Sequence, residues 1–152
     1  MQILSTLLTP GRTVCRAPGI SQKRIFETAA RIISDDQLSL PYELVFSSLI
    51  AREKLGSTGL GNGIAIPHCR VSNCTHAIGT LMTLENPIDF DAPDGKPVDM
   101  LFILLVPEEA QQQHLDILAG IAGLFSQSDF CTQVRAADSA QALFATATNW
   151  NS

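Results

Sequence analysis

The sequence predicts a single α/β domain over residues 1–152, in which a β-sheet is covered by helices on both faces. Residues 98–106 carry this prediction, because every position except Asp99 is apolar, as expected for a central strand buried on both faces. Apolar residues recur at helical spacing in long segments on either side of this strand. The 152 residues and the hydrophobic content of 45% suit one domain with its own core.

The first predicted helix begins at Ser21. Before it, residues 3–8 form a short apolar segment that stops at Pro10, and a strand is predicted to begin at residues 13–15. Ser21 is placed to cap the helix through its hydroxyl group, and the polar residues 34–36 end it. The residues predicted for its buried face are Ile25, Phe26, Ala29, Ala30, Ile32 and Ile33.

A second helix is predicted to begin at Ser39, which serves as its cap. Pro41 suits the first turn, and Glu43 lies near the positive end of the helix dipole. Arg52 lies near the end of this helix, and its neighbours on the same face include apolar residues, so it is expected to border the core. The buried face is predicted to consist of Tyr42, Phe46, Leu49 and Ile50.

The rest of the chain is predicted to complete the sheet and to add three helices. Residues 64–66 form a short strand, and residues 77–84 form the next extended run. The turn-rich sequence A-P-D-G-K-P at residues 92–97, together with residues 87–90, favours a hairpin that leads into the central strand. The helices that follow are predicted at residues 111–127, 129–136 and 139–148.

Charge and composition restrict the class of partner. With a formal net charge of -5 and only ten Lys and Arg residues, the chain is not suited to bind nucleic acid or an anionic membrane surface. No apolar run approaches the roughly 20 residues that span a bilayer, and residues 1–8 lack the features of a signal peptide. A cytoplasmic protein is expected, in which the four cysteines are free thiols.

The segment G-S-T-G-L-G-N-G-I-A-I-P-H, residues 56–68, has the composition of an anion-binding loop. Glycine lets the backbone N–H groups approach a phosphate closely. A histidine at the end of such a loop is largely neutral near pH 7, and its imidazole can carry a phosphoryl group. His68 is therefore the predicted phosphoryl acceptor. The predicted phosphate-binding loop comprises Ser57, Thr58, Gly59, Gly61 and Gly63, with the two hydroxyl groups either donating to the phosphate or only shaping the turn.

Residues 52–68, R-E-K-L-G-S-T-G-L-G-N-G-I-A-I-P-H, closely resemble the active-site segment of the IIA components of the sugar phosphotransferase system. The likeness is greatest to the nitrogen-regulatory branch of the mannitol and fructose IIA family, and it covers nearly the whole chain. It implies a mixed β-sheet with helices on both faces and a phosphotransferase that forms a phosphohistidine and needs no cofactor. The other matching segments are L-S-L-P-x-x-L-V-F at 38–46, P-I-D-F-D at 87–91, P-V-D-M-L-F-I-L-L-V-P at 97–107 and His114 with its following leucine.

The resemblance implies three catalytic residues. Nε2 of His68 takes the phosphoryl group from a phosphorylated histidine-containing carrier protein, which requires Nδ1 to be held as a donor, for example to a backbone carbonyl. Arg52 matches a family arginine that clamps the phosphoryl oxygens with its planar fork of donors. His114 matches a second histidine that donates to the phosphoryl group or tunes the first imidazole. The helix after the central strand places His114 at the carboxyl edge of the sheet, where open α/β folds place their sites.

The sequence also allows structural roles for these residues and a different kind of site. Either histidine could be a hydrogen-bonded structural residue, and Arg52 could be a surface charge. A metal or redox site could use His68, Cys69, Cys74 and His76, although the C-x2-C spacing that makes such a site convincing is missing. Cys69 also departs from the small residue, commonly glycine, that follows the active histidine in the family.

The resemblance leaves two functions open. The protein either is a regulator whose phosphorylation state is read by target proteins, or passes its phosphoryl group to a sugar-specific IIB domain. The regulator is preferred, because the motif details resemble the nitrogen-regulatory branch. Apolar residues beside the loop, Leu55, Leu60 and Ile64, are expected to contact such partners.

Overall fold

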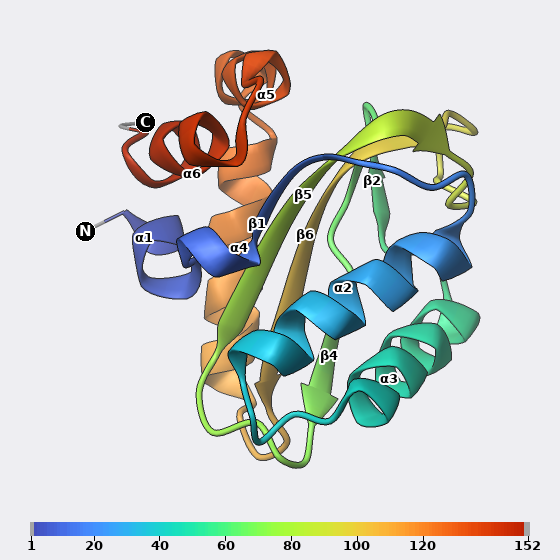
Figure 1. Cartoon of the computed structure of the whole chain (residues 1–152), viewed down its shortest axis with the longest axis vertical. Coiled ribbons are helices and arrows are strands. Elements are labelled where there is room, and N and C mark those ends of the chain that lie inside the picture. Colours follow the sequence, from blue (N-terminus) through green and yellow to red (C-terminus); the bar gives the residue numbers. More distant parts are fainter. Residues whose placement is uncertain (1, 151–152) are drawn as a thin grey trace.

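Six strands form one mixed β-sheet in the computed structural model, which describes residues 2–150 (Figure 1). The strands are β1 (Thr13–Ala17), β2 (Gly59–Gly61), β3 (Ile64–Ala65), β4 (His68–Val71), β5 (Ile78–Ile88) and β6 (Val98–Pro107). Their order is β1-β5-β6-β3-β2, and β4 pairs with β6 further along that strand. The β5–β6 and β2–β3 pairs are antiparallel, while β1, β3 and β4 run parallel to their neighbours in the long hairpin.

Strand β6 lies at the centre of the sheet, as predicted, and its side chains alternate between two cores. This alternation is the two-residue period of an extended chain. The side chains on one face are Leu101, Ile103 and Leu105, and those on the other are Met100, Phe102, Leu104 and Val106. Because all of them are buried, the sheet needs a cover of helices on both sides.

Helices supply that cover on both faces, which confirms the predicted fold class. The helices are α1 (Ile3–Leu7), α2 (Gln22–Asp36), α3 (Tyr42–Leu55), α4 (Gln112–Phe125), α5 (Ser128–Ala136) and α6 (Ala140–Thr148), with the short 3-10 turn η1 (Pro10–Arg12). Helices α2 and α3 lie on one face, and α1, α4 and α6 lie on the other, with α5 at one end (Figure 1). Both faces of the sheet are therefore covered by helices. Helix α4 begins soon after the central strand β6 ends.

The two N-terminal helices differ in how well the sequence predicts them. Ser21 caps α2 as predicted, with its Oγ accepting a hydrogen bond from the Arg24 N–H at 3.2 Å. Ser39 does not cap α3, however, because the chain enters the helix at Pro41, and no side chain bonds the first N–H groups. The buried residues of α3 are Val45 and Leu49, whereas the predicted Tyr42, Phe46 and Ile50 are only half-buried.

The packing of α3 explains this difference in burial. The helix lies against both α2 and the edge strand β4, so its apolar face is shared between two neighbours. Val45 and Leu49 reach the core from the centre of that face. Tyr42 instead stacks on Phe46 at the margin, with ring centroids 5.9 Å apart, and Arg31 lies 5.0 Å above its ring.

The strands near the glycine-rich segment are the part of the fold that was not predicted. Strand β2 and strand β4 were missed, and the predicted strand 64–66 is shortened to β3. Pro67 separates β3 from β4, yet its carbonyl still accepts the Leu104 N–H at 2.9 Å. A proline lacks only the donor, so the chain can stay beside β6 across this break. The consequence is that His68 begins a strand instead of ending a loop.

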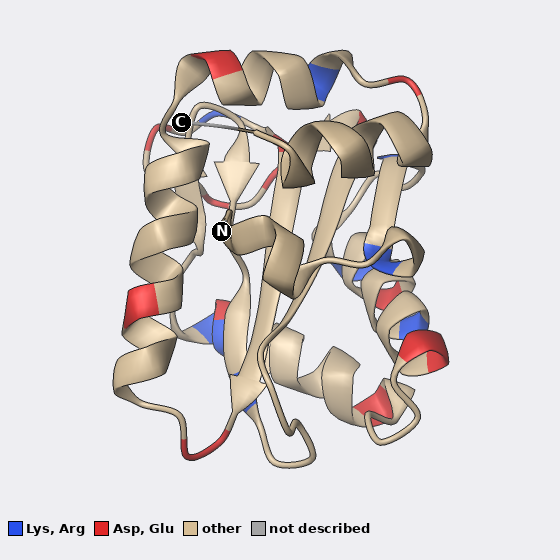
Figure 2. Cartoon of the chain, turned by 90° about the vertical axis from the view of Figure 1, so that its left-hand side faces the viewer, with Lys and Arg blue, Asp and Glu red and all other residues tan. Residues whose placement is uncertain are grey.

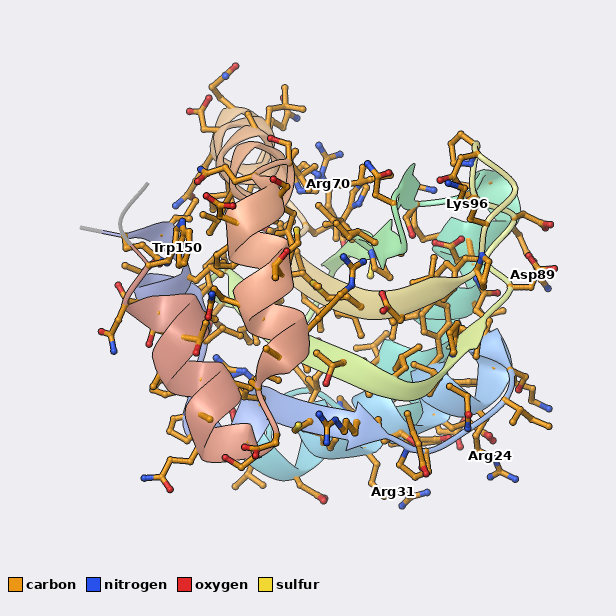
Figure 3. The ribbon with its side chains drawn as sticks, turned by 90° about the horizontal axis from the view of Figure 1, so that it is seen from above. Arg24, Arg31, Arg70, Asp89, Lys96 and Trp150 are labelled. Atoms are coloured by element: carbon orange, nitrogen blue, oxygen red, sulfur yellow. The ribbon has the colours of Figure 1, made fainter. Side chains whose placement is uncertain are left out.

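Charged side chains are unevenly distributed over the surface. Few lie on the face formed by α1, α4 and α6, where Asp116 is the one charged residue of α4 (Figure 2). Arg24 and Arg31 project from the outer side of α2, well apart from Arg70 on β4 (Figure 3). Within residues 2–150, no helix combines the length and the hydropathy needed to cross a membrane.

Candidate active site

His68 is held in one tautomer by the backbone next to it. Its Nδ1 lies 2.6 Å from the carbonyl oxygen of Ile66. A carbonyl oxygen can only accept, so Nδ1 carries the proton and Nε2 carries the lone pair. No residue within the described range 2–150 hydrogen-bonds Nε2. The expectation that a backbone carbonyl holds Nδ1 is confirmed, with the kink at Pro67 bringing Ile66 and the ring together.

The surroundings of His68 keep its imidazole neutral. Burial lowers the pKa of His68 most strongly, and the positive charge of Arg52 lowers it further. The hydrogen bond to Ile66 and the carboxylate of Glu53 act in the opposite direction, but the pKa remains below its ordinary value. At pH 7 the ring is therefore in the form whose nitrogen can act as a nucleophile.

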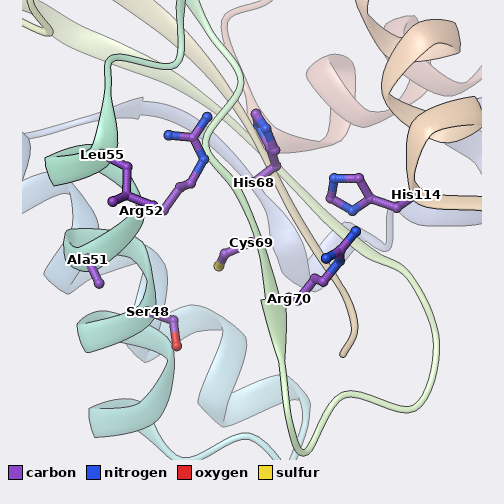
Figure 4. A pocket seen from close by; sticks show the side chains of 8 residues that line it. All are labelled: Ser48, Ala51, Arg52, Leu55, His68, Cys69, Arg70 and His114. Carbon is purple, nitrogen blue, oxygen red and sulfur yellow. The ribbon is translucent and has the colours of Figure 1, made fainter. Parts of the chain in front are cut away.

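A hollow of about 570 Å³ opens beside His68, between α3 and β4. Arg52 faces it from one side, and Arg70 and His114 face it from the other (Figure 4). Its lining contains no carboxylate, although the chain as a whole carries a net charge of -5. The lining residues are Ser48, Ala51, Arg52, Leu55, His68, Cys69, Arg70 and His114. Such a hollow attracts an anion.

Arg52 lies in the last turn of α3 and is half-buried. One of its terminal nitrogens donates to the carbonyl oxygen of Gly56 at 2.9 Å, which ties the guanidinium to the start of the glycine-rich segment. A guanidinium group has five N–H donors, so this bond leaves most of them available. The helix end and the loop together thus present a positive charge at the edge of the hollow.

His114 approaches His68 from α4. The two ring centroids are 5.7 Å apart, and the His114 side chain is buried, with 8% of the residue exposed. Burial lowers the pKa of His114, and the neighbouring His68 and Arg70 lower it further. Its Nδ1 is buried without a hydrogen-bond partner among the described residues. The predicted site residues His68, Arg52 and His114 are therefore brought together by three different elements.

Ser57 and Thr58 use their hydroxyl groups within the turn. Ser57 Oγ donates to the Phe90 carbonyl at 2.6 Å and accepts from the Gly59 N–H at 3.1 Å. The hydroxyl of Thr58 donates to the Glu53 carboxylate, which also accepts the Thr58 N–H at 3.3 Å. Of the two roles left open for these hydroxyls, the structure favours turn shaping.

The predicted phosphate-binding loop is only partly assembled beside His68. Ser57, Thr58 and Gly59 line a second hollow of about 260 Å³ that also contains His68 and Arg52. Gly61 and Gly63 line neither hollow, and their part in the loop stays a prediction. A Cβ on Gly61 would lie 3.4 Å from the Asp94 carboxylate, and one on Gly63 would lie 2.8 Å from that of Asp99. Gly61 ends β2 and Gly63 precedes β3, so the two glycines belong to the hairpin between these antiparallel strands.

Arg70 is a charged residue of the lining that was not predicted from the sequence. It follows His68 by two positions in β4, and the two residues pair with Leu104 and Val106 of β6. Residues two apart in a strand project to the same side, so this spacing places Arg70 next to the predicted nucleophile. The signal was present in H-C-R-V, but it could not be used while the strand was expected to end before Pro67.

The rival metal site is not assembled. Within residues 2–150, no three His, Cys, Asp or Glu side chains are grouped so that they could hold a metal ion. Cys74 Sγ is directed to the His76 carbonyl at 2.9 Å. Burial raises the pKa of Cys69 to about 12, so its thiol is not a thiolate at neutral pH. Ile64 is also buried, with 3% exposed, so the expectation that it contacts partners is wrong.

The chain is similar in sequence and in fold to proteins of one family. Residues 6–149 match the family described as "Phosphoenolpyruvate-dependent sugar phosphotransferase system, EIIA 2". The chain is 48% identical over 141 residues to the nitrogen regulatory protein of Pseudomonas aeruginosa, covering 93% of this chain and 92% of that protein. It is 43% identical over 142 residues to the nitrogen regulatory protein of Escherichia coli (strain K12), covering 93% and 86%.

The fold agrees with the sequence relationship. The crystal structure of nitrogen regulatory protein IIA-Ntr from Neisseria meningitidis superposes with a TM-score of 0.88 at 42% identity, covering 96% of this chain and 99% of that one. The chain therefore belongs to the EIIA 2 family of the phosphoenolpyruvate-dependent sugar phosphotransferase system.

Proposed function

We propose that this chain is a regulatory IIA protein that accepts a phosphoryl group on Nε2 of His68 from a phosphorylated histidine-containing carrier protein. One observation carries the proposal. The Ile66 carbonyl holds Nδ1 at 2.6 Å, which leaves a lone pair on Nε2 beside a hollow without carboxylates. Family membership supports phosphoryl transfer as the type of reaction, and the geometry supports Nε2 as the accepting atom.

The transfer exchanges one phosphorus–nitrogen bond for another. Nε2 of His68 attacks the phosphorus of the carrier's phosphohistidine, the bond to the carrier's imidazole breaks, and that imidazole leaves with the electron pair. Nδ1 of His68 keeps its proton and its bond to Ile66, so the product ring is stabilised in place. Arg52 acts as a catalytic residue by donating to the phosphoryl oxygens as their charge shifts in the transition state. His114 donates from the opposite side through a protonated ring nitrogen.

Regulation follows from the charge that the phosphoryl group adds. A phosphorylated side chain carries about -1.5 to -2 charge at neutral pH, by analogy with other phosphorylated residues. Leu55 and Leu60 lie beside the site with 84% and 49% exposed. A partner that covers them with an apolar surface must desolvate the new charge, whereas a partner with Arg or Lys can pair with it. The two states therefore select different target proteins.

Phosphoryl labelling tests the acceptor residue. Wild-type protein is incubated with a radiolabelled phosphorylated carrier, beside His68→Ala and the matched control His76→Ala, which removes an exposed histidine. We expect one group per chain in the wild type and in His76→Ala, lost in acid and stable in alkali, and none in His68→Ala. Labelling of His68→Ala to the wild-type level contradicts the proposal.

The sugar-specific alternative is tested with the phosphorylated protein. The similarity of this chain to nitrogen regulatory proteins, at 48% and 43% identity, favours a regulator. Phosphorylated protein is mixed with IIB domains of the fructose and mannitol type, and loss of label from His68 is followed over time. A regulator retains its label over the time in which a sugar-specific IIA domain transfers it. Transfer as fast as that of the sugar-specific domain identifies a transport component instead.

A further inference from the structure

Arg70 is placed to reach a group bound to His68. The two residues lie two apart in β4, so their Cα atoms are separated by about 7 Å, and their side chains leave the same side of the strand. The Arg70 side chain extends beside His114 at the edge of the hollow (Figure 4). Arg52 reaches the same hollow from α3, so the two guanidinium groups stand on opposite sides of His68.

The charge of Arg70 has no ion-pair partner in the described part of the chain. The ion pairs among residues 2–150 involve Arg12, Arg24 and Arg135, and none involves Arg70. Because the lining of the hollow holds no carboxylate, its positive charges repel one another until an anion enters. An anion bound in the hollow would reduce this repulsion, so the arrangement of charges favours anion binding.

His114 does not supply a permanent charge on that side. Its pKa lies below the ordinary value because the ring is buried and because His68 and Arg70 are close to it. At pH 7 its imidazole is therefore neutral and contributes one N–H donor. On the β4 side of the hollow, the fixed positive charge comes from Arg70 alone among the lining residues.

We propose that Arg70 is a second catalytic cation for phosphoryl acceptance, binding the phosphoryl oxygens from the side opposite to Arg52. The inference rests on the proposed function of His68. A phosphoryl group presents three terminal oxygens, and a single guanidinium group can bind two of them side by side. Arg52 covers one side, and Arg70 covers the remaining oxygen, so that two fixed positive charges face a group of nearly two negative charges. Arg70 keeps its protons throughout, since only the phosphorus–nitrogen bonds change.

Three variants test this role. Arg70→Gln removes the charge, Arg70→Lys retains the charge without the fork, and Arg24→Gln is the control with the same charge change on the outer side of α2. The rate of transfer from the phosphorylated carrier is measured over a range of carrier concentrations, which separates kcat from KM. Independently, phosphorus NMR of the phosphorylated proteins over pH reports the pKa of the phosphoryl group.

We expect Arg70→Gln to lower kcat about tenfold, the effect of losing one charge-assisted contact in the transition state. It also raises the pKa of the phosphoryl group, because a neighbouring cation favours the dianion. Arg70→Lys moves the pKa less than Arg70→Gln, and Arg24→Gln moves neither quantity.

Several results overturn the proposal. If Arg70→Gln matches Arg24→Gln in both kcat and phosphoryl pKa, Arg70 does not touch the phosphoryl group. If Arg70→Gln raises KM alone, the residue serves to dock the carrier. If the wild-type protein takes no phosphoryl group, or His68→Ala takes as much as the wild type, the proposed function itself fails and this inference fails with it. If the wild type is labelled normally and Arg70→Gln changes neither kcat nor the phosphoryl pKa, only the role of Arg70 is contradicted.

Discussion

Three histidines share similar chemistry, but their environments separate them. His68 has Nδ1 tied to a backbone carbonyl and Nε2 free at the hollow. His76 is exposed, with Nδ1 3.1 Å from the hydroxyl of its exposed neighbour Thr75. His114 is buried with an unpartnered Nδ1. Only His68 combines a fixed tautomer with an accessible lone pair, which is the condition for a nucleophile.

The substitution Arg52→Gln tests the electrostatic part of the site. Arg52 lowers the pKa of His68, so we expect the substitution to raise it. The neutral fraction of His68 then begins to fall at a higher pH as the solution is acidified. Transfer slows by about 30-fold, since a contact formed fully in the transition state is worth roughly 2 kcal/mol. Proton NMR titration of the His68 ring and the rate of phosphoryl acceptance provide the two measurements.

Arg24→Gln is the control for this variant, because Arg24 is an exposed arginine that forms a single ion pair among residues 2–150, with Glu27 at 3.6 Å. It should leave both the pKa of His68 and the transfer rate unchanged. An Arg52→Gln protein with an unshifted His68 titration and a wild-type rate would show that Arg52 is a surface charge.

Three residues predicted for the site from the sequence and the family resemblance, His68, Arg52 and His114, lie together in the structure. A histidine after a glycine-rich segment and an arginine at the preceding helix end both pointed to the hollow. The glycines themselves were ambiguous, because positive φ and small size serve an anion-binding loop and a tight hairpin equally. Gly61 and Gly63 have φ values of 93° and 82°, and the structure uses them in the hairpin between β2 and β3.

At the scale of elements, the β2–β3 hairpin is fastened at its tip by side chains from distant segments. Arg135 of α5 bonds both the Asp99 carboxylate, at 3.0 Å, and the carbonyl of Asn62. Asp94 accepts the Asn62 N–H at 3.0 Å from the other side. The short strands have few ladder bonds of their own, so these contacts define the position of the hairpin.

Gly63→Ala should destabilise this hairpin without affecting the chemistry at His68. The new Cβ would lie 2.7 Å from Arg135 and 2.8 Å from Asp99, at a backbone φ of 82°. We expect a loss of about 1–3 kcal/mol in the free energy of unfolding, measured by urea denaturation. Phosphoryl acceptance by the folded protein should remain, because Gly63 lines neither hollow.

Gly123→Ala provides the matched control. Its Cβ would meet nothing within 4 Å, and the residue lies inside α4. The substitution should stabilise the protein by about 0.5–1 kcal/mol, since alanine is the better helix former. If Gly63→Ala is as harmless as Gly123→Ala, or if it abolishes labelling while the protein stays folded, the hairpin role assigned to Gly63 is wrong.

Element prediction succeeded where hydrophobic patterns were long. Strand β6 and helix α2 have enough residues for their periods to be recognised. Strands β2 and β4 have three and four residues, which is too short to show a period. The position of β4 depends on pairing with β6, a contact between distant segments that no local pattern reports. Arg70 was not predicted as a site residue for the same reason, because it lies in β4.

At the scale of the whole molecule, Arg12 joins three elements, α1, α2 and β5. The residue is 4% exposed. Its guanidinium donates to the Gly79 carbonyl of β5 at 3.1 Å, to the Leu7 carbonyl of α1 at 2.8 Å and to the Asp36 carboxylate of α2 at 2.8 Å. One side chain therefore links helices that cover opposite faces of the sheet.

Arg12→Met should lower the free energy of unfolding by about 3 kcal/mol, because it leaves two carbonyls and a carboxylate without their donor. Arg24→Met, which removes an exposed pair, should change it by less than about 1 kcal/mol. Urea denaturation of both variants gives the comparison. Equal stability of Arg12→Met and Arg24→Met would mean that the elements are held together by apolar packing alone.

The proposed function requires the phosphoryl group to be carried by one particular nitrogen, Nε2 of His68. Nitrogen and phosphorus NMR of protein labelled with ¹⁵N-histidine and phosphorylated by the carrier gives the answer directly, through the coupling between phosphorus and ring nitrogen. We expect the coupling at Nε2 of His68, with Nδ1 still protonated and bonded to the Ile66 carbonyl. Phosphorus on Nδ1 of His68, or on a ring nitrogen of His114, would contradict the account.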